Sequence, residues 1–320
     1  MEPVLGVDLG ASNVRAAVAT EGISVAGHAR ASTPSGDASA VTETLCDTVE
    51  AACADAGVAP ASVAAAGVGT IGPLDDDGTV VLEPVNLEGV DRVPLLPPLR
   101  DRFGIDRVVV HNDAVAGVIG ESRHADAATD DMAYLTISTG IGAGVVVDGA
   151  VLSGHDGNVG EVGHFTLERT GGMPCGCGAT GHWEAYCSGT NIPAYAARLH
   201  HEEGVETSLP VDSSTLTAAD VFAADGTDPL ATLTVDRVGE WNAVGVANLV
   251  QAFAPSYVAV GGAVALNNPD AVLDPIRERL PDRVMIEPPD IALTALGEDV
   301  VVRGALAAAR DAVPDSSQGY

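Results

Sequence analysis

The sequence predicts an α/β protein of two lobes that face each other across a central cleft, each opening with the same strand–turn–strand unit. Two observations support this fold. Residues 4–29 contain an apolar run, then a turn of small residues with glycine, then two further apolar runs. The same order recurs over residues 132–152. Internal duplication of this kind defines an architecture early. The composition, 46% hydrophobic but only 3% aromatic, is typical of an α/β core rich in alanine, valine and glycine.

The first part of the chain is expected to be a meander followed by alternating helices and strands. Short apolar runs between turn residues predict strands, and longer stretches with helical spacing predict helices. The predicted elements are strands at 4–9, 14–20 and 23–29, a helix at 38–57, a strand at 63–68, a loop-rich segment at 74–98 with a strand near 80–82, a strand at 108–111 and a helix at 114–125.

The second part repeats the opening pattern and then becomes mainly helical. The predicted elements are strands at 132–138, 145–147 and 151–152, helices from 188 onward with a long one at 229–253, a strand at 257–260 and a last helix at 301–313. We expect a small lobe over 1–112 plus about 301–314 and a large lobe over 113–300.

The chain is strongly acidic. It has 45 acidic and 15 basic residues, a formal net charge of −30, and every basic residue is an arginine. The charges are spread along the chain rather than grouped in a tail, which favours a folded protein adapted to high salt. The same charge excludes nucleic-acid binding, which needs a basic surface. With no apolar run that could cross a bilayer and no signal segment, we expect a soluble, cytoplasmic protein.

Glycine-rich turns are candidate phosphate-binding loops. Asp8, Gly10 and Ser12 lie at the tip of the first predicted hairpin, where small residues let backbone N–H groups approach a phosphate. Asp8 could there hold Mg²⁺ through water. An ordinary β-turn has the same composition, so one such turn is weak evidence and two in matched contexts are stronger. The corresponding residues of the second hairpin are Thr139, Gly140 and Gly142. A third glycine turn, suited to the nucleoside, contains Gly261 and Gly262.

Asn112 and Asp113 lie between a buried strand and the start of a helix. At this position Asp113 is either an N-terminal helix cap or a general base that accepts the proton of an attacking hydroxyl group. In the second case Asn112 would hydrogen-bond the substrate. Spacing alone leaves both alternatives open.

A metal-ligand pattern follows in the second half of the chain. Cys175 and Cys177, separated by a glycine, and His164 and His182 supply four ligands of the types found in structural zinc sites. Five cysteines in 320 residues do not suggest a disulfide framework, and in a reducing compartment the pattern favours a metal. Cys187 competes with His182 for the fourth position.

Taken together and in this order, the motifs resemble those of the ROK family of sugar kinases, within the actin, hexokinase and chaperone-ATPase superfamily. The resemblance covers nearly the whole chain and includes the run Gly-Glu-Val-Gly-His at 160–164. It implies a two-lobed actin-like ATPase (ribonuclease H-like) fold and a kinase that uses ATP and Mg²⁺ and carries a structural Zn²⁺. It also implies a homodimer or a dimer of dimers.

The resemblance also implies the role of each residue. Asp113 would be the base, and one ring nitrogen of His164 would bind zinc while the other faces the sugar. The implied sugar-binding residues are Asn86, Asn112, Asp113, Glu161, His164 and Glu184. Glucose is the expected substrate, with fructose, mannose or an N-acetylated hexosamine as alternatives. A sugar-sensing repressor of the same family is a further alternative, and the acidity of the chain argues against it.

The chain departs from the family pattern at three places. Ser12 stands where the family usually has threonine, which keeps the hydroxyl group. His182 stands where it usually has cysteine, so a three-Cys, one-His site becomes two of each, which zinc accepts. Loops also differ, since Ile71 replaces a common proline and the loop from His164 to Cys175 is one residue longer than usual.

Overall fold

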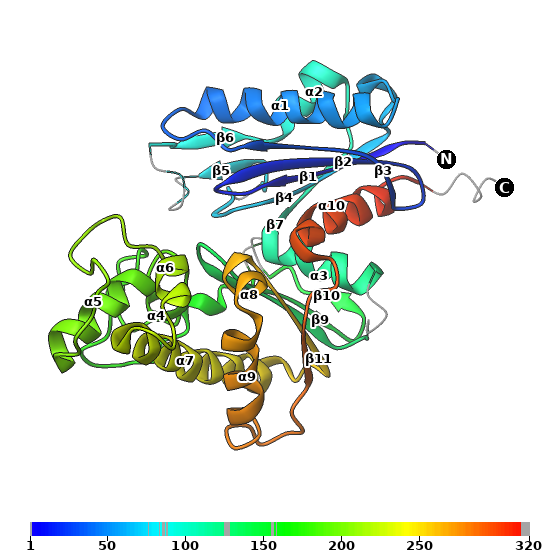
Figure 1. Ribbon diagram of the computed structural model, residues 1–320. Helices are drawn as coiled ribbons and strands as arrows, with labels where there is room; N and C mark the ends of the chain where they lie inside the picture. The colour runs from blue at the N-terminus through cyan, green and yellow to red at the C-terminus, as the bar shows by residue number, and fades with distance from the viewer. Residues whose placement is uncertain are drawn as a thin grey trace. The chain divides into compact units, whose positions relative to one another are not determined.

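The computed structural model describes residues 2–75, 77–82, 84, 87, 89–124, 129–154, 157 and 159–314, and the chain divides into two compact units. The first unit comprises Met1–Ala128, Val151–Val159 and Asp299–Tyr320, and the second comprises Thr129–Ala150 and Gly160–Glu298. Each unit has its own sheet and helices (Figure 1). No helix within the described ranges is long and apolar enough to span a membrane.

The first unit is a five-stranded sheet, in the order β3-β2-β1-β4-β7, with helices on both faces. Figure 1 shows α1 and α2 on one side and α3 and α10 on the other. Since both faces are covered, β1 is buried along its whole length. The elements are β1 (Val4–Leu9), β2 (Asn13–Glu21), β3 (Ser24–Ser32), α1 (Ala38–Asp55), η1 (Pro60–Ser62), β4 (Ala65–Thr70), β5 (Val80–Leu82), β6 (Arg92–Pro94), α2 (Leu96–Phe103), β7 (Val108–Asn112), α3 (Asp113–His124) and α10 (Val300–Asp311).

Helix α10 lies unusually close to its neighbours because glycines leave room for its backbone. A Cβ atom on Gly67 of β4 would lie 1.9 Å from the carbonyl oxygen of Ala305. One on Gly304 of α10 would lie 1.7 Å from the carbonyl oxygen of Ala116 in α3. Any side chain at these positions would push α10 away from the sheet and from α3, so both glycines are needed for the packing.

The second unit repeats this plan with a sheet in the order β10-β9-β8-β11-β12. Its long helix α7 packs against α5 and α9. The elements are β8 (Met132–Ile137), β9 (Ile141–Val147), β10 (Ala150–Val151), η2 (Val162–His164), α4 (Glu184–Cys187), α5 (Ile192–Glu203), α6 (Ala218–Ala223), α7 (Pro229–Phe253), β11 (Tyr257–Gly261), α8 (Ala263–Asn267), α9 (Pro269–Arg279), β12 (Asp290–Leu293) and η3 (Gly297–Asp299).

The predicted duplication is confirmed by strand pairing. In the first unit β1 is antiparallel to β2 and parallel to β4. In the second unit β8 is antiparallel to β9 and parallel to β11. Each sheet is therefore a three-strand meander extended by two parallel strands, and each meander begins with a hairpin whose turn contains glycine.

The structure differs from the sequence-based assignment in two respects. Beyond the general expectation of helices after residue 188, the sequence-based assignment did not place β6, α2, α4 or β12, and it did not place α8 and α9 individually. The boundary between the units also differs, because α3 packs against α10 and therefore lies in the first unit, whereas the expected boundary after residue 112 assigns it to the second.

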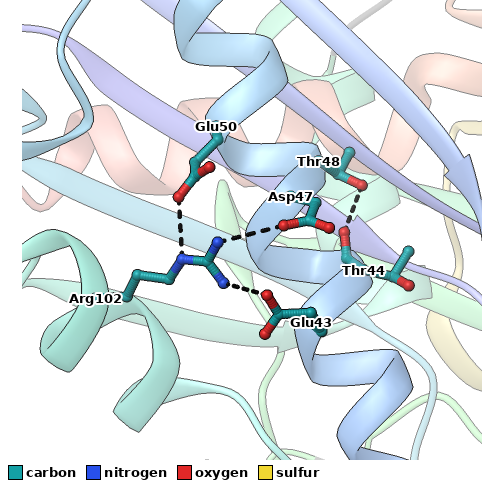
Figure 2. Close-up of polar contacts among 6 residues, drawn as sticks. All are labelled: Glu43, Thr44, Asp47, Thr48, Glu50 and Arg102. Atoms are coloured by element: carbon teal, nitrogen blue, oxygen red, sulfur yellow. Dashed lines mark hydrogen bonds and ion pairs between the residues drawn. The ribbon is translucent and has the colours of Figure 1, made fainter.

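A charge cluster joins α2 to α1 in the first unit. The guanidinium group of Arg102 donates hydrogen bonds to Glu43, Asp47 and Glu50 at 2.9, 3.3 and 3.0 Å. Figure 2 shows these three carboxylates along one face of α1, directed at the same arginine. Residues at this spacing share a helix face, so the single arginine offsets their mutual repulsion.

Candidate active site

Asp8 is a buried carboxylate beside the first glycine turn. It is 4% exposed, and Arg15, directly opposite on β2, places Nη1 3.0 Å from Asp8 Oδ2. Burial raises the pKa of Asp8 to about 6, although Arg15 lowers it. The turn that follows is closed by the N–H of Gly10, which donates to Asn13 O at 2.9 Å, and Ser12 is exposed at its tip. The charge of Asp8 near neutral pH therefore depends on Arg15.

Asn112 and Asp113 lie at the same sheet edge as Asp8. Strands β1, β4 and β7 are parallel, and Gly69 of β4 is paired with Asp8 on one side and with His111 on the other. The carboxyl ends of these strands therefore meet, which is where open α/β sheets bind ligands. The first unit thus brings together the predicted phosphate-loop carboxylate and the predicted base.

Both side chains contact the first turn of α3. Asn112 is 8% exposed and its Oδ1 accepts the N–H of Ala114 at 2.9 Å. Asp113 Oδ1 accepts the same N–H at 2.7 Å. Helix capping is therefore shared by the two side chains, and accepting an N–H hydrogen bond does not by itself prevent a carboxylate from accepting a proton. The remaining sugar-binding candidate of this unit, Asn86, lies outside the described residues.

Three candidate sugar-binding side chains lie together in the second unit. Glu161 directly precedes η2, and its Oε2 lies 3.7 Å from Nε2 of His164. Burial raises the pKa of Glu161, and the nearby Glu184 carboxylate adds to this rise against the effect of His164. Glu184 begins α4, and its Oε2 accepts the N–H of Ile141 at 2.9 Å.

The four predicted metal ligands converge. Ligand atoms of His164, Cys175, Cys177 and His182 all lie within 4.8 Å of one another. His182 Nδ1 lies 3.3 Å from both His164 Nδ1 and Cys177 Sγ, and His164 Nδ1 lies 3.7 Å from Cys175 Sγ. With Nδ1 of His164 among these atoms, its Nε2 is the atom that approaches Glu161. Two thiols and two imidazoles around one point fit Zn²⁺.

The local electrostatics also fit a metal. Burial, followed by the neighbouring His164, lowers the pKa of His182 and keeps its ring in the neutral form that binds metals. Burial raises the pKa of Cys175 to about 11, and a bound cation would reverse that rise. Cys187 is fully buried, and its Sγ lies 3.5 Å from Val238 O in α7. The structure therefore brings His182, and not Cys187, to the cluster.

Tyr186 of α4 holds the loop that carries the two cysteines. Its hydroxyl oxygen accepts the N–H of Met173 at 2.9 Å, and its O–H donates to Glu168 at 2.6 Å. Its ring stacks on Trp241 of α7 with 4.7 Å between ring centres. A buried hydroxyl that both donates and accepts is fully used, so the loop is fixed to α4 and, through the ring, to α7.

The second glycine turn connects β8 and β9. Ser138 N–H donates to Gly140 O at 2.9 Å, which closes the turn around Thr139. A Cβ atom on Gly262, which has φ of 87°, would lie 2.5 Å from Ile137 O, so the turn after β11 lies against the turn end of this hairpin. The second unit therefore brings together all five glycine-turn residues predicted for it: Thr139, Gly140, Gly142, Gly261 and Gly262.

Sequence reasoning missed two contacts in these sites. Arg15 had a usable signal, because a hairpin with turn residues 10–13 places positions 8 and 15 opposite each other and a buried carboxylate needs a partner. The bond from Ile141 to Glu184 spans 43 positions, and no local pattern could have indicated it.

The doubled sheet, with a glycine hairpin at the start of each half, is the two-domain actin-like ATPase fold. Comparison with known proteins defines the family within it. The model of the ROK family matches residues 4–312, and the chain belongs to that family.

Three similar proteins support this assignment. The chain is 34% identical over 315 residues to a glucokinase of Pyrobaculum calidifontis, covering 97% of this chain and 95% of that one. The structure of a ROK family glucokinase from Streptomyces griseus, in complex with glucose and AMPPNP, is 29% identical with a TM-score of 0.79, covering 97% and 99% of the two chains. A ROK hexokinase from Thermus thermophilus is 33% identical with a TM-score of 0.78, covering 96% and 98%.

Proposed function

We propose that the protein is an ATP-dependent hexose kinase that phosphorylates glucose. The observation that carries this proposal is the similarity, along nearly the whole chain, to proteins named glucokinase. The fold alone would not decide between activities, because one fold can serve many functions. The carboxylates and glycine turns described above supply the groups that phosphoryl transfer needs.

In the proposed reaction Asp113 accepts the proton of the sugar hydroxyl group that attacks the γ-phosphorus of ATP. The new O–P bond forms as the bond from the γ-phosphorus to the β–γ bridging oxygen breaks, and ADP leaves. Glycine-turn N–H groups would donate to phosphate oxygens, and the Asp8 carboxylate would hold Mg²⁺. When bound, Mg²⁺ neutralises charge on the phosphates. The residues proposed to hold the sugar are Asn86, Asn112, Glu161, His164 and Glu184. Catalysis of this kind consists mainly of positioning and charge stabilisation.

We also propose a structural Zn²⁺ held by His164, Cys175, Cys177 and His182. The convergence of four ligand atoms within 4.8 Å supports it, as does the neutral form of His182. The ion would fix the orientation of the His164 ring so that Nε2 is directed to the sugar. Metal analysis of the purified protein should find about one zinc per chain.

Two properties of the whole protein belong to the same proposal. A net charge of −30 without any lysine suits a protein that works in a high-salt cytoplasm, where carboxylates are screened and hydrated. Activity should persist in molar KCl, and a protein that is best folded in dilute buffer would contradict this. The protein should also be a homodimer or a dimer of dimers, which light scattering in the same salt would test.

The direct test is an ADP-release assay over a panel of hexoses and phosphoryl donors in high KCl. The panel should contain glucose, fructose, mannose and an N-acetylated hexosamine. We expect glucose with ATP to give the highest kcat/KM. Turnover of another hexose alone would replace the substrate in this proposal, and the absence of any hexose-dependent ADP release would refute the kinase assignment.

Asp113→Asn tests the proposed base. The amide keeps the side-chain size but cannot accept the proton, so kcat should fall about a thousandfold or more while glucose affinity stays within about tenfold. Asp101→Asn, at an exposed position on α2, is the matched control and should leave both unchanged. Unchanged turnover in Asp113→Asn would rule out the base assignment.

A further inference from the structure

The backbone of the β8–β9 hairpin is bonded to the segment that carries Glu184. The N–H of Ile141, next to the glycine turn, donates to the Glu184 side chain at 2.9 Å. Five residues beyond Glu184, the N–H of Gly189 donates to Ser138 O at 2.7 Å. The second proposed phosphate turn is therefore held on one side by the start of α4 and on the other by the residues that follow it.

A second segment with a proposed sugar-binding residue also contacts this hairpin. Ala143 of β9 donates its N–H to Gly160 O at 2.8 Å, immediately before Glu161. The contact is so close that a Cβ on Gly160 would lie 1.7 Å from Ala143 O. Likewise, a Cβ on Gly163 would lie 2.4 Å from Ile141 O. The backbone of the phosphate turn and the segments that carry the sugar carboxylates thus pack as one body within the second unit.

Glu184 differs from Glu161 in one respect that matters for function. Both are proposed to receive sugar hydroxyl groups. The carboxylate of Glu184 also accepts the N–H of Ile141 in the hairpin, whereas the carboxylate of Glu161 lies beside His164. A carboxylate–N–H bond is charge-assisted and stronger than a neutral one. A ligand that restrains the Glu184 carboxylate therefore also restrains the N–H of Ile141. Ile141 directly follows the turn whose N–H groups are proposed to bind the nucleotide phosphates.

We infer that Glu184 couples hexose binding to nucleotide binding, an inference that rests on the proposed kinase function. A hexose hydroxyl donated to Glu184 restrains its carboxylate, which holds Ile141 and favours the turn conformation that accepts phosphate. The nucleotide then loses less conformational entropy in ordering the turn, so it binds more tightly. Coupling between binding sites is reciprocal, so the nucleotide tightens hexose binding by the same factor.

The test is equilibrium binding by calorimetry in high KCl, with glucose and a non-hydrolysable ATP analogue with Mg²⁺. In the unaltered protein, saturating glucose should lower the Kd of the analogue about tenfold, within the usual range of coupling. In Glu184→Asp the shorter side chain cannot reach both the sugar and Ile141. The ratio of the two Kd values should then fall to within about twofold of unity.

Two further variants separate coupling from simple loss of binding. Glu161→Asp is the matched control, because it shortens a sugar contact without touching the Ile141 bond, so glucose should bind more weakly while the ratio stays near ten. Gly189→Ala touches neither ligand but places a Cβ 3.0 Å from Ser138 O. It should reduce the ratio while leaving glucose affinity without nucleotide unchanged, and it gives a second test if Glu184→Asp does not fold.

The outcomes distinguish the two levels of the argument. If the unaltered protein binds neither ligand, the proposed function fails. If it binds both but the ratio is unity, or if Glu184→Asp and Gly189→Ala both keep the unaltered ratio, the kinase proposal stands and the coupling role of Glu184 is wrong.

Discussion

The two glycine hairpins share a topology but differ in what holds them. One pair away from the turn, the β1–β2 hairpin has Asp8 opposite Arg15, whereas the β8–β9 hairpin has Thr136 opposite Gly142. The first hairpin therefore carries its own charge pair. The second has no charge at this position, and its polar partner is Glu184, from much later in the chain.

This difference separates local from long-range control of a site. A cross-strand pair depends only on the hairpin that contains it. The anchor of the second hairpin depends on everything that positions α4, including His182 of the metal cluster, two residues before Glu184, and Tyr186, two residues after it. Changes to the metal loop should therefore reach the second hairpin and leave the first intact.

Metal removal should have the largest effect and should fall on the second unit. Without an ion the cluster has no central bond, so the loop and the start of α4 are released together. Glucose affinity should fall about 100-fold, and amide hydrogens over residues 160–187 should exchange faster while those of β1 and β2 do not change. Hydrogen exchange with and without a chelator measures both regions in one experiment.

Matched cysteine variants sharpen this test. Cys177→Ser removes a ligand, whereas Cys187→Ala alters a buried thiol outside the cluster. Only the first should lose zinc and glucose affinity. Equal protection of both hairpins after chelation would show that the second does not depend on the metal loop.

Replacing Arg15 should affect only the first hairpin. Asp8 has a pKa of about 6 with Arg15 beside it. Without that charge the pKa rises further, so at neutral pH more Asp8 is protonated and holds Mg²⁺ less well. Arg15→Met should lower kcat only about twofold at neutral pH and by a larger factor as the pH falls below about 6, with recovery as the pH is raised.

Arg30→Met is the control for this prediction. Arg30 of β3 lies opposite Arg15 of β2, and its Nε donates to Asn13 Oδ1. It also lowers the pKa of Asp8, but less than Arg15 does. Its effect on the pH profile should be smaller. A pH profile of Arg15→Met that matches the unaltered protein would show that Arg15 does not control Asp8.

Local patterns made much of this molecule predictable. Strands β1 and β8, and the turns that follow them, could be assigned because short apolar runs and small turn residues determine a hairpin over few residues. Asp8, Asn112 and Asp113 could be singled out for the same reason, since each lies where a strand ends. The candidate metal-binding segment could be singled out from residue type, because few other patterns place two cysteines around one glycine.

Long-range packing explains what could not be predicted. Helix α9 contains Pro275, which argues against a helix from sequence, but its ring packs where Gly239 of α7 leaves room. Helix α3 lies with the first unit because of α10, nearly two hundred residues away. Neither the Glu184–Ile141 bond nor the choice of His182 over Cys187 has a local signal.

Asp228 provides a pH test of a long-range anchor in the second unit. It caps α7, is 5% exposed, and accepts the N–H groups of Leu230, Ala231 and Ser208. Burial alone would raise its pKa, but the bonds from the N–H groups of Ser208 and Ala231 and from the hydroxyl groups of Thr207 and Ser208 lower it to about 2. Because the folded-state pKa is depressed, this stabilisation is present above about pH 4 and is lost as the pH falls through about 2.

Asp228→Asn should therefore cost about 2 kcal/mol of unfolding free energy near neutral pH, and progressively less below about pH 4. Denaturant unfolding at several pH values measures this. Asp225→Asn, an exposed change in the same connection, should have little effect. A cost that does not change with pH would show that the charge of Asp228 is not what stabilises the cap.

The smallest effect is expected at Arg102, a surface anchor in the first unit (Figure 2). Its side chain is 34% exposed, and it holds Glu43, Asp47 and Glu50 on one face of α1. Arg102→Gln leaves these carboxylates to repel one another, so Tm should fall on the order of 2 °C in dilute buffer and not at all in molar KCl, where screening is nearly complete. The contrast with Asp228 is the informative part. Salt screens hydrogen bonds from backbone N–H groups to a buried carboxylate only a little, so the loss of stability in Asp228→Asn should persist in molar KCl. If the loss of stability in Arg102→Gln also persists there, packing rather than charge joins α2 to α1.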